Sequence, residues 1–518
     1  MPGERNLVIK DRRKVSLRFA LAYPNVYGVG MSNLAVRLLY EYINNRQDAL
    51  CERFFFTQYG ELPRSVESGL LLPDFDVVGF SLQHEMDYLR MLDMLSSSGI
   101  PIRSTKRKSP VVIAGGPSAT ANPIPISPFV DFFVIGEAEP ILDDLLSALA
   151  VGKPKRALGS LRGIYRAGGS AERLIVEDLD AAYHPVRQVH SLRPDEFSSS
   201  FLLEVSRGCS RGCRFCMECF LYQPKRQRSL GRIEEILDQG IASTCLKRVT
   251  CISSAFFDHS QLMEVLASLR SRGLRFSLPS VRISGTKEGL MELLAAGGQR
   301  SITIAPETPS ARLREVINKR FSEDQLKALL GEAKSAGITS LKVYLMVGIP
   351  GERPSDLEEM DALMGTISSS GFRPSSVHIS VNPMIPKSHT PFQWSPIIAE
   401  AEYSERVAIL RRICSRHGVR RFEFMDHRWG VIQAYLSTAD EGASRVLDAL
   451  VADLRSGGSG DLGSWRRVLR PMGMSLESLH RPPDLGSDLP WEAIKGAISK
   501  SHLIREHGRA MSFASGDA

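Results

Sequence analysis

Short apolar runs alternate with longer amphipathic stretches over the first 150 residues of the chain. The apolar runs are Leu17–Tyr23, Arg53–Phe56, Asp76–Ser81, Val111–Ala114 and Phe132–Ile135, and the helical stretches lie at residues 33–44, 85–97 and 140–150. Buried strands that alternate with helices are typical of a parallel, doubly wound sheet. We therefore expect an α/β domain over residues 1–150.

Polar and glycine residues follow the predicted strands of this domain. The strand ends carry Ser81, Gly115, Gly116 and Gly136. Ligands of doubly wound sheets bind beyond the carboxyl ends of the strands, and glycine lets a ligand approach the backbone closely. Tight turns in a sheet without any ligand would use the same residues, so this edge is a candidate binding site and not a demonstrated one.

The alternation stops at residues 151–195 and resumes at about residue 196. In between, Gly168-Gly169-Ser170 separates two short strand-like runs, which predicts a linker with a hairpin. The later strand signals are Phe201–Val205, Arg248–Ile252, Arg275–Leu278, Ser301–Ile304, Ser340–Val347 and Ser376–Val381. Six strand–helix units predict an incomplete parallel barrel, a partial (β/α)6 arrangement over residues 196–420, with its active site at the carboxyl ends of the strands.

Helix signals dominate the remainder of the chain. Capping boxes at Ser322-x-x-Gln325 and Ser355-x-x-Glu358 predict two helix starts inside the barrel. Beyond it, amphipathic helices are expected at residues 430–436 and 443–454, and a final helix at residues 491–499. We expect residues 421–518 to form a small, mainly helical region.

Bulk properties exclude some classes of protein. The 518 residues are 43% hydrophobic and carry a net charge of +7, which is ordinary for a globular enzyme and only weak support for a nucleic-acid partner. Residues 1–14 lack the apolar segment of a signal peptide, and no run of about 18 apolar residues predicts membrane insertion. Eight cysteines in a chain of this length do not suggest a disulfide framework, so we expect a reducing, cytoplasmic location.

Three of the cysteines have the spacing of metal ligands. Cys209, Cys213 and Cys216 form a C-x3-C-x2-C loop after the first barrel strand, with the aromatic Phe215 before the third cysteine. Three thiolates can hold three irons of a [4Fe–4S] cluster and leave the fourth iron open to a small molecule. Arg207, Arg211 and Arg214 would lower the pKa of the thiols. A zinc site with Cys219 as fourth ligand is the alternative.

This loop resembles the signature of the radical S-adenosylmethionine superfamily. In that family the open iron binds the amino and carboxylate groups of S-adenosylmethionine, and an electron from a reductant such as ferredoxin or flavodoxin cleaves the sulfonium to give a 5′-deoxyadenosyl radical. The resemblance implies that S-adenosylmethionine is contacted by Phe215, Ser253, Ser254, Ser280, Arg282, Glu307, Gly348 and Gly351.

Residues 15–420 resemble a subgroup with an N-terminal cobalamin-binding-like domain. The resemblance implies that cobalamin, if bound, lies on Ser81, Gly115, Gly116 and Gly136. Two features depart from the family pattern. The Gly-Gly-Glu after strand two is absent, and Ser253-Ser254 stands there. The Asp-x-His-x-x-Gly that supplies a cobalt ligand is absent too, and the nearest histidine is His84.

Three function classes remain open from the sequence. The first is a radical enzyme that uses cobalamin to transfer a methyl group, or to perform related chemistry, at an unactivated carbon. The second modifies RNA or protein without cobalamin, and its first domain is a scaffold. The third is a non-catalytic iron–sulfur or electron-transfer protein. Cys219 is either a hydrogen-atom donor, a radical acceptor or a spectator thiol.

Overall fold

The predicted N-terminal sheet is present in the computed structural model, and it has one strand more than expected. The structure describes residues 3–151, 154–192, 199–278, 280–285 and 287–516. The six-stranded sheet has the order β3-β2-β4-β5-β6-β7. Its strands are β2 (Leu17–Tyr23), β3 (Ala49–Phe55), β4 (Val77–Ser81), β5 (Val111–Gly115), β6 (Phe132–Val134) and β7 (Ile164–Tyr165). The first five in the chain are parallel, whereas β7 is antiparallel to β6. The order places a topological switch point between β2 and β4.

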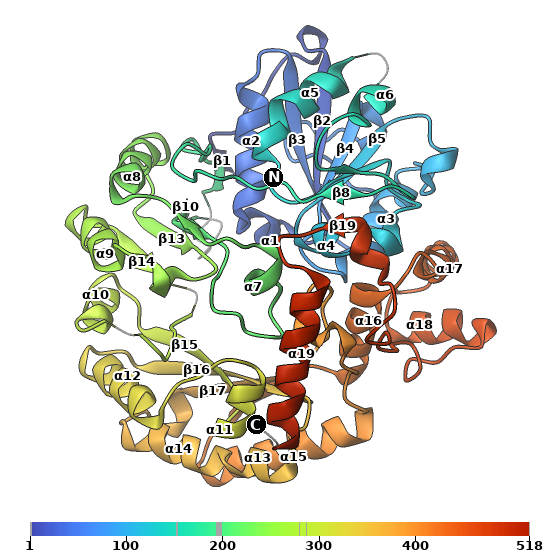
Figure 1. Cartoon of the computed structure of the whole chain (residues 1–518). Helices are drawn as coiled ribbons and strands as arrows, with labels where there is room; N and C mark the ends of the chain where they lie inside the picture. Colours follow the sequence, from blue (N-terminus) through green and yellow to red (C-terminus); the bar gives the residue numbers. More distant parts are fainter. Residues whose placement is uncertain (1–2, 152–153, 193–198, 279, 286, 517–518) are drawn as a thin grey trace.

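Helices cover both faces of this sheet (Figure 1). The helices of the domain are α1 (Tyr27–Met31), α2 (Leu34–Asn45), α3 (Asp87–Ser97), α4 (Pro117–Ala121), α5 (Leu142–Ala150) and α6 (Pro154–Leu158). Successive strand residues face opposite sides, so Phe19 packs with α2 and α5, and Ala20 packs with α3. The α3 face is completed by three helices from the far end of the chain, α16 (His427–Thr438), α17 (Ala443–Arg455) and α18 (Leu462–Leu469).

The connection between the two α/β regions does not form the predicted hairpin. Gly168 has a positive φ and makes the expected turn, but the strands on either side of it pair with different partners. Strand β7 joins β6, and β8 (Ala171–Glu172) pairs with β19 (Ile494–Lys495) from the C-terminal region. The first domain is therefore tied to the end of the chain through backbone hydrogen bonds.

The second α/β region is the partial barrel expected from the sequence, with an additional strand. A three-stranded sheet, β10 (Phe201–Glu204), β13 (Arg248–Ile252) and β14 (Arg275–Ser277), is followed by a four-stranded sheet, β15 (Ser301–Glu307), β16 (Ser340–Val347), β17 (Val377–Pro383) and β18 (Arg421–Phe424). All neighbours are parallel, and the Val281–Ile304 bridge joins the two sheets. Strand β18 extends the barrel past residue 420.

The barrel helices lie outside the strands. They are α8 (Leu230–Thr244), α9 (Leu262–Ser271), α10 (Leu290–Ala296), α11 (Ala311–Val316), α12 (Glu323–Ser335), α13 (Pro354–Glu358), α14 (Met360–Ser369) and α15 (Glu400–Arg416). The capping box at Ser322 is confirmed. The prediction of a capping box at Ser355 is wrong, because α13 already begins at Pro354. Arg353 is the N-cap instead, and its backbone N–H donates to the Asp356 carboxylate at 2.7 Å.

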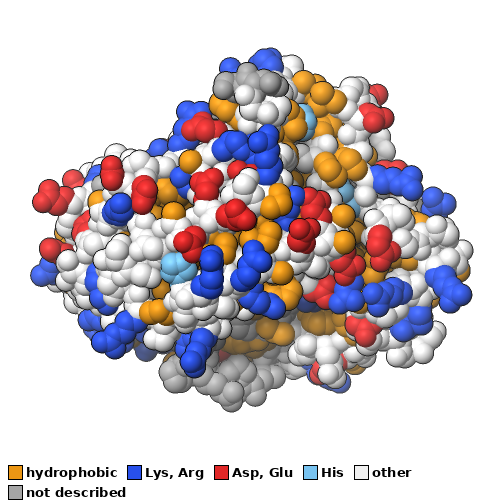
Figure 2. Space-filling view, turned by 90° about the horizontal axis from the view of Figure 1, so that it is seen from below, with side chains coloured by type: hydrophobic (Ala, Val, Ile, Leu, Met, Phe, Trp, Pro, Cys, Tyr) orange, Lys and Arg blue, Asp and Glu red, His pale blue; other side chains and the backbone are white. Residues whose placement is uncertain are grey.

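The last helix begins nine residues later than expected. Residues 491–499 hold part of a short 3-10 helix (Pro490–Ala493) and strand β19, and the final helix is α19 (Lys500–Ser515), capped by the Ser499 side chain. Figure 1 shows α19 running back from the first domain along the barrel to α11. Within the described ranges, no helix is both long and apolar enough to cross a membrane. On the face shown in Figure 2, acidic and basic side chains are interspersed, so that face offers no broad basic surface.

Candidate functional site

The cysteine loop starts from a close contact between two backbone segments. Strand β11 (Ser206–Arg207) pairs with β12 (Arg226–Gln227), and the loop between them runs through Gly208 to α7 (Met217–Leu221). Gly208 has φ 73°, and a Cβ there would lie 2.1 Å from the Tyr222 carbonyl oxygen. Only glycine permits this approach, which curls the chain so that Cys209 and Cys216 lie near each other.

The far side of the loop is fastened to the end of α11 and to α19. The Arg214 N–H donates to the Ile317 carbonyl at 3.0 Å, and the Asn318 amide donates to the Gly212 carbonyl at 2.9 Å. The Arg214 guanidinium donates to the Glu506 carboxylate at 3.0 Å and to two carbonyls at the end of α11. The position of the thiols is thus fixed by segments distant in the sequence.

The loop brings four thiols to one cavity of about 230 Å³, those of Cys209, Cys213, Cys216 and Cys219. A hydrogen bond from Cys219 lowers the pKa of Cys209 to about 6, and the same kind of bond lowers the pKa of Cys213. Thiolates, not thiols, ligate metals. The cavity therefore favours the form of the cysteines that binds iron.

One of the three arginines predicted to lower the thiol pKa values acts on them, since the Arg211 backbone N–H bonds to Cys209 and lowers the pKa of that thiol. Arg211 pairs with Asp258, and Arg207 is directed to a second cavity, where three carboxylates surround it. Arg282 lowers the pKa of Cys209 and Cys213, and Lys319 lowers that of Cys213, both after the larger contribution of Cys219. These side chains come from segments after β14 and α11, so their proximity could not be inferred from the loop itself.

Six of the residues expected to bind S-adenosylmethionine line the thiol cavity, namely Phe215, Ser253, Ser254, Ser280, Arg282 and Glu307. The Glu307 carboxylate accepts from the Lys319 ammonium at 2.7 Å. Lys319, Asp258 and Phe321 also line the cavity and were not predicted, since no motif marks them. The described lining of the cavity thus combines four thiols, three carboxylates and three cations.

Gly348 and Gly351 do not line the thiol cavity. They border a separate cavity of about 250 Å³ together with Glu352 and Trp394. Gly348 has φ 88°, and its N–H donates to the Glu352 carboxylate at 3.1 Å. In this structure the glycine turn after β16 is packed against the Ile398 side chain rather than against the thiols.

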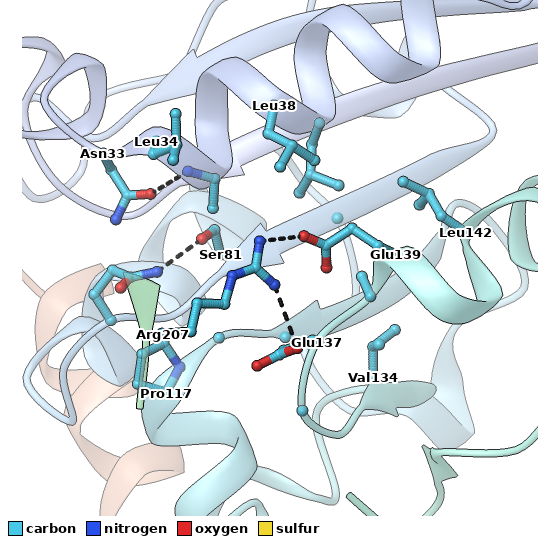
Figure 3. Close-up of a pocket in the computed structure, with 18 of the residues that line it drawn as sticks. Asn33, Leu34, Leu38, Ser81, Pro117, Val134, Glu137, Glu139, Leu142 and Arg207 are labelled. Atoms are coloured by element: carbon cyan, nitrogen blue, oxygen red, sulfur yellow. Dashed lines mark hydrogen bonds and ion pairs between the residues drawn. The ribbon is translucent and has the colours of Figure 1, made fainter. Parts of the chain in front are cut away.

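A larger cavity of about 580 Å³ lies beyond the carboxyl ends of the N-terminal sheet (Figure 3). Ser81, Gly115, Gly116 and Gly136 all line it, as predicted from the strand ends. Gly116 has φ 102°, and a Cβ there would lie 2.5 Å from the Leu82 carbonyl oxygen, so this position requires glycine. One part of the cavity is apolar. It is lined by leucines of α2 and α5, namely Leu34, Leu38, Leu39, Leu142, Leu145 and Leu146.

Charged side chains from the barrel form the opposite wall of this cavity. Figure 3 shows Arg207 between Glu137 and Glu139, at 3.3 and 2.6 Å, and it also pairs with Glu204 at 2.6 Å. No histidine is among the described residues that line the cavity. His84 instead contacts the Gln433 amide at 2.7 Å, outside the lining.

The two cavities share a wall. Glu218, Ser253 and Ser254 line both of them, and the Ser254 hydroxyl donates to the Glu218 carboxylate at 2.6 Å. Burial raises the pKa of Glu218. Sequence reasoning missed Glu218, whose only signal is its position two residues after Cys216. A molecule bound at this wall would be within reach of ligands in both cavities.

The zinc alternative finds no support in the described part of the chain. No three or more His, Cys, Asp or Glu side chains converge there closely enough to hold a single metal ion.

Two family profiles match the chain. Residues 35–162 match the N-terminal domain of radical SAM proteins, and residues 203–364 match the radical SAM superfamily. An uncharacterized protein of Methanocaldococcus jannaschii, MJ0966, is 28% identical over 474 residues, which is 88% of this chain and 99% of that protein. The uncharacterized methyltransferase PH0819 of Pyrococcus horikoshii is 23% identical over 48% of this chain and 56% of its own length.

Two solved structures share the fold. The radical S-adenosylmethionine methyltransferase TsrM of Kitasatospora setae, solved with cobalamin and a [4Fe–4S] cluster, has a TM-score of 0.57 at 13% identity, over 86% of this chain and all of TsrM. The cobalamin-dependent S-adenosylmethionine radical enzyme OxsB has a TM-score of 0.51 at 16% identity, over 97% of this chain and 80% of OxsB. The similarity extends across both α/β regions.

Proposed function

We propose, from the premise that this chain belongs to the radical S-adenosylmethionine superfamily, that it is a cobalamin-assisted radical enzyme. The thiol cavity would hold a [4Fe–4S] cluster on Cys209, Cys213 and Cys216, and S-adenosylmethionine beside it. The cavity of the N-terminal sheet would hold cobalamin. Together they would transfer a methyl group to an unactivated carbon, or perform related chemistry there.

The shared wall of the two cavities is the observation that carries this proposal. A methyl donor on one side and a radical source on the other must reach the same carbon, and Glu218, Ser253 and Ser254 border both. When bound, the cluster supplies the electron that cleaves the sulfonium of S-adenosylmethionine, and cobalamin supplies the methyl group. The chain's own residues position the reactants and exclude water.

The lining of the N-terminal cavity would suit cobalamin in its chemistry. Its volume of about 580 Å³ is in the range of small-molecule pockets and would accept part of that cofactor. Gly115 would leave the edge of the sheet open to the macrocycle, and the leucines of α2 and α5 would offer apolar contacts to the cofactor. Because no histidine is found in the described lining, cobalt would receive no histidine ligand there.

Similarity to known proteins supports the same assignment. TsrM and OxsB are cobalamin-dependent or cobalamin-bound enzymes with this fold, and the Pyrococcus relative is named a methyltransferase. An external reductant, such as ferredoxin or flavodoxin, would supply the electron. The substrate would lie at the shared wall, close to Glu218.

The first test is loading of both cofactors, followed by analysis of the products. Anaerobically reconstituted protein should bind cobalamin and, with a strong reductant and S-adenosylmethionine, release 5′-deoxyadenosine and S-adenosylhomocysteine, detected by mass spectrometry. Cob(II)alamin on the protein should lack nitrogen superhyperfine splitting in its electron paramagnetic resonance spectrum. Gly115→Leu should block cobalamin but not the iron–sulfur absorbance, whereas Gly331→Leu, where a Cβ meets nothing within 4 Å, should load both.

Two results would count against the proposal. Release of 5′-deoxyadenosine by protein that takes up no cobalamin would leave a radical enzyme that modifies RNA, protein or another substrate without cobalamin. Protein that carries a cluster but does not cleave S-adenosylmethionine would fall in the electron-transfer class.

A further inference from the structure

The cavity holds one thiol more than the family signature requires. Cys219 lies in α7, three residues after Cys216, and its backbone N–H donates to the Cys216 carbonyl at 3.2 Å. Its side chain is 1% exposed. Its thiol lines the same cavity as the thiols of Cys209, Cys213 and Cys216. The helix thus directs the fourth thiol to the other three.

The fourth thiol also faces the expected substrate side of the cluster. Cys219 lines the same cavity as Ser253, Arg282 and Glu307, which come from the ends of three barrel strands or the segments that follow them. Cys219 belongs to one small apolar cluster with Cys209, Cys213, Phe220, Trp394, Trp491 and Leu503. This packing keeps the Cys219 side chain away from solvent.

Three thiolates leave one iron of a cubane cluster without a protein ligand. We propose that Cys219 ligates this fourth iron while the enzyme waits for S-adenosylmethionine, and that binding of S-adenosylmethionine displaces it. The inference rests on the cluster of the proposed function. It assigns Cys219 the role of an exchangeable ligand, in place of a hydrogen-atom donor or a spectator thiol.

The exchange balances without a change of oxidation state. The bond from the Cys219 thiolate to iron breaks, and bonds from the amine and a carboxylate oxygen of S-adenosylmethionine form. The ammonium of free S-adenosylmethionine loses one proton to become a ligand, and the released thiolate gains one. No electrons move, so the step needs neither an oxidant nor a reductant.

An exchangeable fourth thiolate would protect the cluster. An iron with only small-molecule ligands is the one most readily lost on oxidation, which leaves a [3Fe–4S] cluster. Ligation by Cys219 would retain that iron until substrate arrives. It would also compete with S-adenosylmethionine, because the binding-competent form is then only a fraction of the protein.

The test compares wild-type protein with Cys219→Ala, Cys219→Ser and Cys414→Ala, all reconstituted anaerobically with ⁵⁷Fe. Cys414 is also a buried thiol but lies in α15, outside the cavity. All four proteins should assemble a [4Fe–4S] cluster by Mössbauer spectroscopy. Brief ferricyanide oxidation should produce the [3Fe–4S]⁺ paramagnetic resonance signal strongly in Cys219→Ala, at an intermediate level in Cys219→Ser, and weakly in wild type and Cys414→Ala.

Affinity for S-adenosylmethionine provides the second readout. If the Cys219-ligated form makes up nine-tenths of the resting protein, Cys219→Ala should bind S-adenosylmethionine about tenfold more tightly than wild type. Equal iron loss and equal affinity in wild type and Cys219→Ala would overturn the inference and leave the proposed function intact. Failure of wild-type protein to assemble any cluster would overturn both.

Discussion

Glu307 takes an unusual backbone conformation to reach the thiol cavity. Its φ is 66°, in the left-handed region, and β15 loses its regular register with β16 at this point. Such a conformation costs about 1–3 kcal/mol in a residue other than glycine, and residues of this kind cluster at functional sites. The carboxylate it presents is held by Lys319 at 2.7 Å.

Glu307→Gln should weaken binding of S-adenosylmethionine by about 1–3 kcal/mol, because it removes a charged hydrogen-bond acceptor from the cavity. Calorimetric titration of anaerobically reconstituted protein measures this loss. Glu405→Gln serves as control, since Glu405 is an exposed residue of α15 and does not line the thiol cavity. Unchanged affinity of Glu307→Gln would assign Glu307 a structural role.

Local spacing was sufficient to predict residues within the cysteine loop and at strand ends. Cys209, Cys213 and Cys216 lie within eight residues of one another, so their convergence follows from the loop alone. The convergence of Lys319 and Arg282 on these thiols depends on how distant barrel segments fold. Gly348 and Gly351 were expected beside S-adenosylmethionine because of a resemblance, and the packing of Ile398 into their turn could not be foreseen.

At the scale of elements, α19 and the cysteine loop form one unit. Glu506 of α19 accepts from the buried Arg214 at 3.0 Å and from the exposed Arg509 at 2.6 Å. The two arginines therefore share one carboxylate, but only Arg214 links the helix to the loop. Arg214 is 3% exposed, whereas the Arg509 side chain is 68% exposed.

Arg214→Gln should lower the free energy of local opening of α19 by about 1.5–3 kcal/mol, the contribution of hydrogen bonds to a charged group. Arg509→Gln should lower it by at most about 1 kcal/mol, because exposed ion pairs contribute little. Hydrogen exchange of the α19 amides, followed by mass spectrometry, measures both values. Equal protection in the two variants would mean that Arg214 does not hold the helix.

Elements with a clear apolar period were predictable, and elements stabilised by tertiary packing were not. Strand β16 was placed correctly because alternate residues are buried along its length. Strand β18 was missed because none of its residues is fully buried, so its sequence carries no strand period and pairing with β17 alone defines it. Helix α19 was missed because Trp491 suggested an earlier apolar helix, although Ser499 is a good N-cap.

At the scale of the whole molecule, a buried ion pair joins the first domain to the barrel. The Lys387 ammonium, which follows β17, donates to both carboxylate oxygens of Glu85 at 2.6 and 2.7 Å. The Glu85 side chain is 3% exposed and also accepts from the Gln433 amide at 3.2 Å. Burial alone would raise the pKa of Glu85, but Lys387 holds it below the ordinary value of 4.5.

Lys387→Met should lower the free energy of unfolding by about 3–5 kcal/mol, because it leaves Glu85 as an unpaired buried charge. The wild-type pair stabilises the fold above pH 4.5 and loses that contribution as the pH falls through the lowered pKa of Glu85. In the Lys387→Met variant, burial raises the pKa of Glu85. The stability of the variant should therefore recover as the pH falls and Glu85 becomes protonated. Thermal melts on both sides of pH 4.5, from about pH 3 to pH 8, measure both trends.

Two variants complete this experiment. Glu85→Gln combined with Lys387→Met should regain most of the lost stability, since no buried charge remains. Lys500→Met, which breaks a partly exposed pair with Glu492, should leave the melting curve nearly unchanged. A Lys387→Met protein as stable as wild type at neutral pH would show that the two domains do not depend on this pair.

The link between Arg214 and Glu506 spans 292 residues of the chain, and this separation has a consequence for biosynthesis. At about 5–20 residues per second, a ribosome needs roughly 15–60 s to advance from the cysteine loop to α19. During that interval the nascent cysteine loop lacks the contact with α19. For the first part of the interval it also lacks the contact with the α11 carbonyls. Iron–sulfur assembly factors would therefore meet a cysteine loop without this support until α19 has been synthesised and has folded against it.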